Sequence, residues 1–319
     1  MNEHERIAAD RFGLTGTSNP LPGYTDENAK IVDRNGDTAL LRISPSDADP
    51  GEIAFCQRVI GATVDLEVET PSVVPTIDGD GWAILDDGRI AHMYKWVDGV
   101  SFSEVGSPAH LAGEIGAVAG SMVCCLCGVK AWQRSSGFEW EMTDAGRVLR
   151  EQMGSIGDGR RRKLIGRVLD RYDRIDFSTL PRQVIHNDLN GENLLVRDDA
   201  IAGVIDFADV VESVRIAELA IACAYAMLGQ IDPVSVALDI IAGYRSVVEP
   251  TGAEIDVLFD LILARLAISV TMSASSDGTN PHQLASEAPA WDLLGHLMAA
   301  DVDAISAEFS AVPHARRPA

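Results

Sequence analysis

The stretch Val184–Val210, VIHNDLNGENLLVRDDAIAGVIDFADV, contains the most informative residues of this sequence. Two short apolar runs flank a polar loop that presents Asp188 and Asn193. A further apolar run, Gly203–Ile205, leads directly into Asp206. Because a strand that ends in a carboxylate delivers that charge to one place with little freedom, we interpret the stretch as a strand–loop–strand insert that carries the chemistry.

Phosphoryl transfer needs residues of these types at this spacing. One carboxylate orients the attacking hydroxyl and accepts its proton, while an Asn and a second Asp hold Mg²⁺ on the phosphates of the nucleotide. Asp188 precedes Asn193 by five residues, and the next apolar strand ends in Asp206-Phe207, as in the catalytic loop of kinases. We predict that Asp188 is the catalytic base and that Asn193 and Asp206 are metal ligands. The alternative is a pair of hairpin turns capped by Asn and Asp side chains, and His186 is expected to brace the loop.

The charge of the chain limits its partners. The net charge of the 319 residues is −22, and such a surface repels nucleic acids and anionic membranes. We therefore expect neither as a partner, whereas a small cationic substrate would be attracted. A hydrophobic content of 46% and this length are typical of a globular protein with about two domains.

The cysteines, the N-terminus and one long apolar stretch together predict that the protein is located in a reducing cytoplasm. Five Cys are an odd number, which predicts no disulfide framework, and the cluster Cys124-Cys125-x-Cys127 is interpreted as core residues. The N-terminus, Met1–Asp10, is polar and charged, unlike a signal peptide. The apolar stretch Leu111–Val129 carries Glu114 and several Gly, and we interpret it as a buried helix.

Strand and turn signals fill the first third of the chain. Asn35-Gly36 is a hairpin turn signal between the strand candidates Asn28–Val32 and Thr38–Ser44. A helix is predicted at Glu52–Ala62, and further strands are predicted at Val73–Ile77, Trp82–Leu85 and Ile90–Trp96.

Apolar residues at helical spacing dominate the remainder. Helices are predicted at Leu111–Val129, Thr143–Met153, Lys163–Ile175, Ala217–Leu228, Pro233–Val248, Ile255–Ser273 and Trp291–Glu308. The short strands Gln183–Ile185, Leu194–Val196 and Gly203–Ile205 interrupt them. This order predicts an α+β fold with two lobes, a small antiparallel β-sheet lobe over residues 1–97 and a larger helical lobe over residues 98–319. A linker near Trp96–Gly99 would join them, with a ligand cleft in between.

Several segments resemble the aminoglycoside phosphotransferase and choline kinase superfamily, which has a protein-kinase-like fold. The loop has Asn187 after the His, and Asp-Phe is followed by Ala208 and Asp209, as is usual in that superfamily. LPGYTDEN (Leu21–Asn28) resembles the nucleotide loop of its hydroxylysine-kinase-like subgroup. ARLAISV (Ala264–Val270), NPHQL (Asn280–Leu284) and APAWDLL (Ala288–Leu294) resemble the C-terminal signature of that subgroup. The resemblance implies a nucleotide-binding lobe at residues 1–97, ATP or GTP and Mg²⁺ as cofactors, and a small hydroxylated amine or amino acid as substrate.

The resemblance also implies which residues bind the nucleotide. Arg42, on the strand Thr38–Ser44, stands where the superfamily has its phosphate-binding Lys, so either it replaces that Lys or nucleotide binding is altered. A further alternative is an exposed Arg of an edge strand. Glu52 is the candidate acidic partner of Arg42, with Glu67 and Glu69 as alternatives. Asn28 belongs to the nucleotide loop. Tyr94 and Trp96 lie where the lobes should join, and main-chain groups there could hydrogen-bond an adenine. The alternative is that this segment forms only core and linker.

Two other functions stay open on the sequence. An antibiotic phosphotransferase, acting on an aminoglycoside or a cyclic peptide, would use the same fold and the same loop. A pseudokinase-like binding protein is favoured by Arg42 in place of Lys, whereas the intact set of Asp188, Asn193 and Asp206 argues against it.

Overall fold

The computed structural model describes residues 1–23, 25–132, 138–275 and 281–313, and the chain divides into two compact units. The first unit contains Met1–Asp98 together with the short segment Gly203–Ile205. The second contains Gly99–Ala202 and Asp206–Ala319. Antiparallel sheets and helices are both present, so the predicted α+β class is confirmed.

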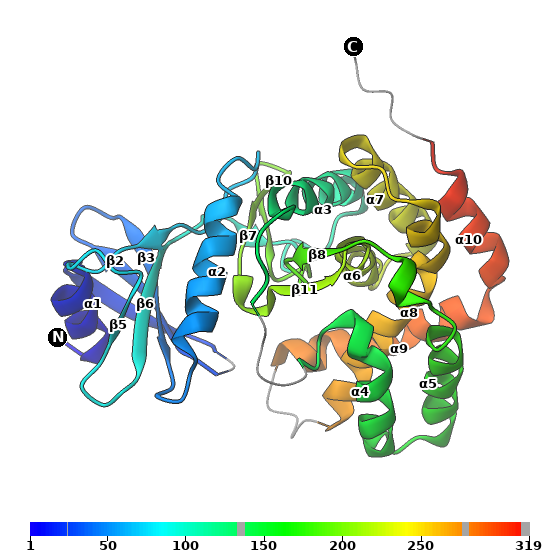
Figure 1. The fold of residues 1–319 in the computed structure, drawn as a ribbon, viewed down its shortest axis with the longest axis horizontal. Coiled ribbons are helices and arrows are strands. Elements are labelled where there is room, and N and C mark those ends of the chain that lie inside the picture. Colours follow the sequence, from blue (N-terminus) through cyan, green and yellow to red (C-terminus); the bar gives the residue numbers. More distant parts are fainter. Residues whose placement is uncertain (24, 133–137, 276–280, 314–319) are drawn as a thin grey trace, which may run out of the picture. The chain divides into compact units, whose positions relative to one another are not determined.

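The first unit is built around one antiparallel sheet (Figure 1). Its strands follow the order β1-β2-β3-β6-β4, and β5 pairs with β6 beside β4. The predicted hairpin is confirmed: Gly36 has φ 89° in the turn, and the Asp33 carboxylate accepts the amides of Asn35 and Asp37. The strands are β1 (Gly16–Leu21), β2 (Glu27–Asp33), β3 (Thr38–Ser44), β4 (Val73–Val74), β5 (Trp82–Ile84) and β6 (Ile90–Lys95).

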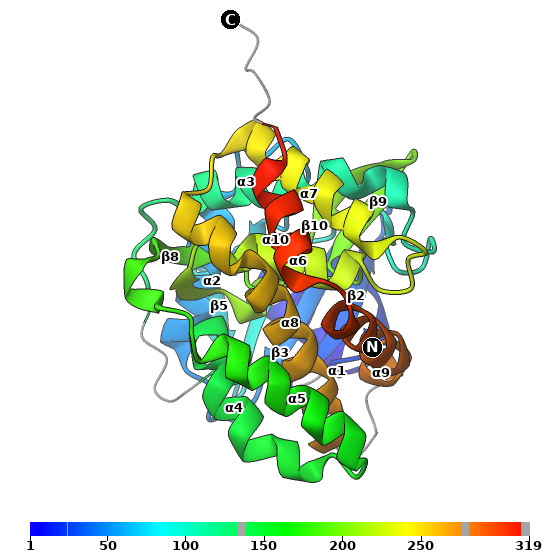
Figure 2. The same cartoon turned by 90° about the vertical axis from the view of Figure 1, so that its right-hand side faces the viewer.

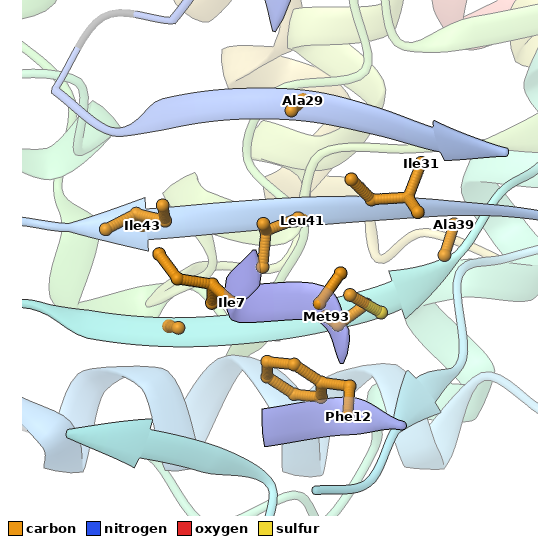
Figure 3. Close-up of a cluster of buried hydrophobic side chains, with 10 residues drawn as sticks. Ile7, Phe12, Ala29, Ile31, Ala39, Leu41, Ile43 and Met93 are labelled. Atoms are coloured by element: carbon orange, nitrogen blue, oxygen red, sulfur yellow. The ribbon is translucent and has the colours of Figure 1, made fainter. Parts of the chain in front are cut away.

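The side chains of β3 alternate between the two faces of this sheet. Ala39, Leu41 and Ile43 of β3 point to one face and are buried, because successive side chains of a strand alternate. Helix α1 (Glu3–Phe12) covers that face with Ile7 and Phe12 (Figure 3). Helix α2 (Pro50–Ala62) begins after the capping residue Asp49 and contains the predicted helix Glu52–Ala62.

Sequence patterns did not reveal α1 and β1. Helix α1 has only a few apolar residues, and its start depends on a capping box in which Asn2 and Glu5 exchange hydrogen bonds. Strand β1 includes Pro20 and lies at the edge of the sheet, where a missing N–H is tolerated. Both elements are stabilised by packing and pairing with β2 rather than by a local pattern.

Helices dominate the second unit, and α8 lies at its centre (Figure 2). Most residues of α8 are buried, since α4, α5, α6, α9 and α10 all contact it. Two small sheets, β10-β9-β7 and β11-β8, complete the unit. The helices are α3 (Ala112–Leu126), α4 (Ala145–Gln152), α5 (Gly159–Tyr172), α6 (Ala217–Ala226), α7 (Pro233–Val247), α8 (Gly252–Ser275), α9 (Pro281–Ala299) and α10 (Val302–Ala311). The strands are β7 (Val100–Ser101), β8 (Arg182–Ile185), β9 (Leu194–Arg197), β10 (Ala200–Val204) and β11 (Val211–Val214).

Two predictions about this unit are wrong. The single helix predicted at Trp291–Glu308 is divided between α9 and α10, because Asp301 caps a new helix by accepting the amide of Ala304. The cysteine cluster does not belong to the core throughout, since Cys124 and Cys127 are exposed at the end of α3 and Cys125 is half-buried. The apolar face of α3 is instead formed by other residues, such as Ile115, Ala119 and Met122.

One helical stretch among the described residues, Ala109–Leu126, is long and apolar enough to span a membrane. It comprises α3 and the turn before it, and it packs against α6 and α7. Leu111, Ile115 and Leu126 are fully buried there, as expected for a core helix.

Candidate active site

The predicted catalytic loop connects β8 to β9 in the second unit. Asn187 has φ 68°, a left-handed conformation that Asn tolerates better than most residues, and this turns the chain directly before Asp188. The Asn190 side chain accepts the amides of Glu192 and Asn193, which closes the loop. The buried ring of His186 accepts the amide of Asp188 through Nδ1 at 3.3 Å and lies edge-on to Phe207, so it contacts the loop from inside.

The carboxylate of Asp188 is held from two sides. Its Oδ2 accepts the side-chain amides of Asn190 at 2.9 Å and of Asn193 at 2.7 Å. Its Oδ1 accepts Nη2 of Arg265 at 2.9 Å. With 19% of the side chain exposed, Asp188 is still accessible to a small molecule. The loop therefore brings Asp188 and Asn193, two predicted site residues, into direct contact.

Arg265 is a residue that sequence reasoning did not assign to the site. It lies in α8 with 1% of its surface exposed, between Trp140 and Tyr225, whose rings lie 4.9 Å and 5.3 Å from its guanidinium carbon. A signal was present in the segment ARLAISV, because a charged residue within an apolar helix is rarely buried unless it is paired.

Glu218, at the start of α6, contacts the main chain of the catalytic loop from the protein interior. It is buried, and its Oε2 accepts the main-chain amide of Asn187 at 3.1 Å. Burial raises the pKa of Glu218 to about 7, although the hydrogen bond from Asn187 acts in the opposite direction. Its Oε1 is also buried and has no hydrogen-bond partner among the described residues. A protonated carboxyl suits this position, since it avoids a buried charge.

We expect Glu218→Gln to remove a pH dependence of stability. The unfolded chain releases this proton near the ordinary pKa of 4.5, whereas the folded chain keeps it until about 7. The folded state thus binds more protons between these values, so the wild-type free energy of unfolding falls as pH rises from 4.5 to 7, by about 3 kcal/mol at most. The Gln variant, which resembles the protonated acid, should lack this loss. Urea unfolding at pH 5 and pH 8 measures it.

The matched control for this prediction is Glu212→Gln, the same change at an exposed position of β11. It should leave the pH dependence as in the wild type. Parallel stability curves for the wild type and the Glu218→Gln variant would contradict the role given to burial.

The predicted metal ligands fit Mg²⁺ by the chemistry of their donors. Asn193 donates its Nδ2 to both the carbonyl and the carboxylate of Asp188, which leaves its amide oxygen as the atom able to bind a metal. Asp206 is exposed and has φ 59°, and its Oδ1 accepts the amide of Ala208 at 3.3 Å. One carboxylate and one amide oxygen are hard ligands of the kind that Mg²⁺ takes beside phosphate oxygens.

Arg42 lies in the first unit and is half-buried on the central strand β3. The alternative of an exposed Arg on an edge strand is therefore wrong, because β2 and β6 flank β3. Its Nε and Nη2 each contact Oδ2 of Asp26 at 2.9 Å. Burial, and then the positive charge of Arg42, lower the pKa of the neighbouring His92 to about 3, so that ring is neutral.

The other predicted nucleotide-binding residues are distributed over the same unit. Asn28 is the cross-strand partner of Arg42 and donates to the carbonyl of Pro22. Tyr94 is buried, with its hydroxyl 2.9 Å from Nδ1 of His92. Glu52 lies half-buried in the first turn of α2. Tyr24, in the predicted nucleotide loop, lies outside the described residues.

The segment Tyr94–Trp96 lies near the predicted linker. The amides of Lys95 and Trp96 donate to the carbonyls of Ser72 and Thr38. These two N–H groups are engaged within the first unit. The Trp96 ring lies 3.9 Å from the ammonium group of Lys30.

Comparisons with known proteins relate the fold to a group of kinases. Residues 18–256 match the phosphotransferase enzyme family. Hydroxylysine kinase of Danio rerio is 26% identical over 287 residues, which cover 82% of this chain and 80% of that protein. The structure of a microcompartment-associated aminopropanol kinase has a TM-score of 0.73 at 19% identity, covering 93% of this chain and 97% of that one. The amicoumacin kinase hAmiN, solved with AMP-PNP, Ca²⁺ and Ami, has a TM-score of 0.71 at 14% identity, covering 93% and 94%. The two structures show the fold alone, and the resemblance stated from the sequence is confirmed.

Proposed function

We propose that this chain, which belongs to the phosphotransferase enzyme family, transfers the γ-phosphate of ATP to a hydroxyl group of a small amine or amino-acid-like molecule. That it is a small-molecule kinase follows from the family and from its curated relatives. The observation that carries the finer proposal is the carboxylate of Asp188, which is accessible to solvent and oriented by neighbours on both oxygens.

The loop residues and Asp206 have defined roles in this proposal, and Asn193 has two. Asp188 orients the acceptor hydroxyl and accepts its proton. Asn190 and Asn193 fix the carboxylate by donating to Oδ2. Asn193 and Asp206 would hold Mg²⁺, which when bound supplies positive charge to the β- and γ-phosphate oxygens. ATP is the proposed donor, with GTP as the alternative.

The proposed acceptor carries both a hydroxyl and an amine. The curated relatives are hydroxylysine kinases, and one structural neighbour is an aminopropanol kinase. The net charge of −22 favours a cation over an anion as the small molecule that approaches this surface. The proposal includes a cytoplasmic location, since the exposed thiols of Cys124 and Cys127 would persist in a reducing compartment.

A phosphate-transfer screen tests the function. The purified chain is incubated with Mg²⁺ and either ATP or GTP, and phosphorylated products are detected by mass spectrometry. The acceptors are hydroxylysine, aminopropanol, ethanolamine, choline, kanamycin and hygromycin B, and lysine is the matched control because it lacks the hydroxyl. We expect transfer to an amino alcohol and none to lysine. Transfer to the antibiotics alone would replace the proposal by the antibiotic kinase, and nucleotide binding without any transfer would favour a pseudokinase.

Arg42 is proposed to bind the nucleotide phosphates in place of Lys. Arg42→Ala should raise the Michaelis constant for the nucleotide and lower turnover, because a charge-assisted contact to phosphate is lost. Arg42→Lys should keep substantial activity, since the charge remains. Steady-state kinetics with varied nucleotide measure both variants.

The ion pair with Asp26 provides the control for Arg42. If the role of Arg42 is its ion pair with Asp26, Asp26→Asn removes that pair as Arg42→Ala does, and the two variants should alter the kinetics in the same direction. If Arg42 binds phosphate, Asp26→Asn leaves the guanidinium in place and should not raise the Michaelis constant for the nucleotide. Equal increases in the Michaelis constant for the nucleotide in Asp26→Asn and Arg42→Ala would contradict the phosphate-binding role of Arg42.

A further inference from the structure

We propose that Arg265 is a positioning residue, which holds one oxygen of Asp188 so that this oxygen receives the acceptor hydroxyl. The inference rests on the proposed function, because it takes Asp188 as the base of the same reaction. It adds a residue from α8 to a site that is otherwise formed by the loop between β8 and β9 and by the start of the segment at Asp206.

The guanidinium of Arg265 is fixed by its surroundings. Nε donates to the hydroxyl of Tyr225 at 3.2 Å, Nη1 to the carbonyl of Trp140 at 3.3 Å, and Nη2 to Asp188 at 2.9 Å. The rings of Trp140 and Tyr225 lie within cation–π distance of it. A planar group with three donors engaged and two aromatic neighbours has little freedom to rotate, so it is a rigid support for the carboxylate.

The occupancy of the Asp188 oxygens decides where a hydroxyl can bind. A carboxylate oxygen accepts about two hydrogen bonds in the carboxylate plane. Oδ2 already accepts two, from Asn190 and Asn193, whereas Oδ1 accepts one, from Arg265, among the described residues. Oδ1 therefore keeps the remaining acceptor position. The acceptor hydroxyl donates to Oδ1, next to the guanidinium, and its proton is transferred to that oxygen.

Arg265 differs from the other supports of Asp188 in its place in the fold. Asn190 and Asn193 belong to the same loop as Asp188, so they move with it. Arg265 lies 77 residues further along the chain, in the central helix α8 of the second unit. Among the residues that the structure describes, Arg265 is thus the one that connects the Asp188 carboxylate directly to the packed helices.

Electrostatics agree with a cation at this position. Arg265 attracts the charge of Asp188. When Glu218 is ionised, its charge and that of Asp188 repel each other, and Arg265 attracts both. Asp209 is a further carboxylate that acts on Arg265. A buried Arg is costly unless it is paired, so its presence between an aromatic pair and the base indicates a defined partner.

The test replaces Arg265 by Met and by Lys and compares turnover with nucleotide binding. Arg265→Met should lower kcat about 10²-fold, the scale of a misplaced reacting group, and leave the affinity for Mg²⁺–nucleotide unchanged in calorimetry. Arg265→Lys should recover part of kcat, because it keeps the charge and one donor. Tyr225→Phe removes one support of Arg265 and keeps the contact with Asp188, so its loss of kcat should be smaller than that of the Met variant.

The matched control is Arg215→Met. Arg215 also forms an ion pair within the second unit, with the buried Glu254, whose Oε1 accepts its Nε at 2.9 Å. Both Met variants should unfold at lower temperature than the wild type, but kcat per folded molecule should fall only in Arg265→Met. If Arg265→Met does not fold, the kcat values of Arg265→Lys and Tyr225→Phe are compared with that of Arg215→Met instead.

Three outcomes would overturn the inference. They are a kcat of Arg265→Met equal to that of Arg215→Met, a Lys variant no better than the folded Met variant, and a crystal structure of the Met variant in which the Asp188 carboxylate keeps its orientation. The crystal structure needs no acceptor. If Asp188→Asn lowers turnover and Arg265→Met does not, only this inference fails. If Asp188→Asn has no effect, the proposed function itself fails.

Discussion

Asp188→Asn should lower turnover by about 10²-fold or more, the usual contribution of a positioned general base. The Asn side chain cannot accept the proton of the acceptor hydroxyl. It also has an NH2 group, with two donor hydrogens, where Asp188 has an acceptor oxygen, so either the two amides of Asn190 and Asn193 or the guanidinium of Arg265 faces another donor. Nucleotide binding should persist, because Arg42 and the other residues predicted to bind the nucleotide are not part of this contact set, and Asn193 keeps its amide oxygen for Mg²⁺.

The control for this variant is Asp198→Asn. Asp198 is exposed in the turn between β9 and β10 and has φ 54°, a conformation that Asn tolerates. The same chemical change is thus made ten positions away without strain. Turnover is measured with the acceptor found in the screen, and folding is measured by thermal unfolding. Wild-type turnover in Asp188→Asn would remove this residue from the mechanism.

Asp206→Ala should abolish Mg²⁺-dependent transfer. The proposed site has one carboxylate and one amide oxygen from the protein, so the variant would lose the only charged ligand that the proposal assigns to it. Asp206→Asn should keep a trace of activity that rises with the concentration of Mg²⁺, because an amide oxygen is a weaker ligand. Initial rates over a Mg²⁺ titration measure both variants.

Backbone strain has to be separated from metal binding at this position. Asp206 has φ 59°, where Ala is disfavoured by roughly 1–2 kcal/mol. Asp199 has φ 62° and is exposed, so Asp199→Ala introduces the same strain away from the site. That control should keep its activity. Transfer by the wild type in excess chelator would contradict the phosphoryl-transfer mechanism as a whole.

Local patterns were sufficient for much of the fold. The turn at Asn35-Gly36 and the alternation in Thr38–Ser44 predicted the hairpin of β2 and β3, because both signals depend on neighbours in the sequence. The helices of the second unit follow from apolar spacing in the same way. The division between α9 and α10 was missed, since Asp301 interrupts an apolar pattern that continues on both sides.

Elements whose sequence lacks a strong hydrophobic pattern could be recognised only from their tertiary contacts. Helix α1 is mostly polar, and only packing of Ile7 and Phe12 on the sheet shows why it is ordered. The exposure of Cys124 and Cys127 could not be predicted either, because composition does not tell which face of α3 is turned to α6 and α7.

The sequence by itself determined the family and supplied the prediction of the reacting residues. Asp188, Asn193 and Asp206 lie within nineteen residues of one another, so their types and spacing could be recognised without a fold. Only the tertiary structure decided how the carboxylate of Asp188 is held. Arg265 and Glu218 act on the loop from 77 and 31 positions away, and nothing in the order of residues shows which helix face will meet it. The physical reason is that a buried charge is stable only beside its partner, and packing, not sequence distance, brings the two together.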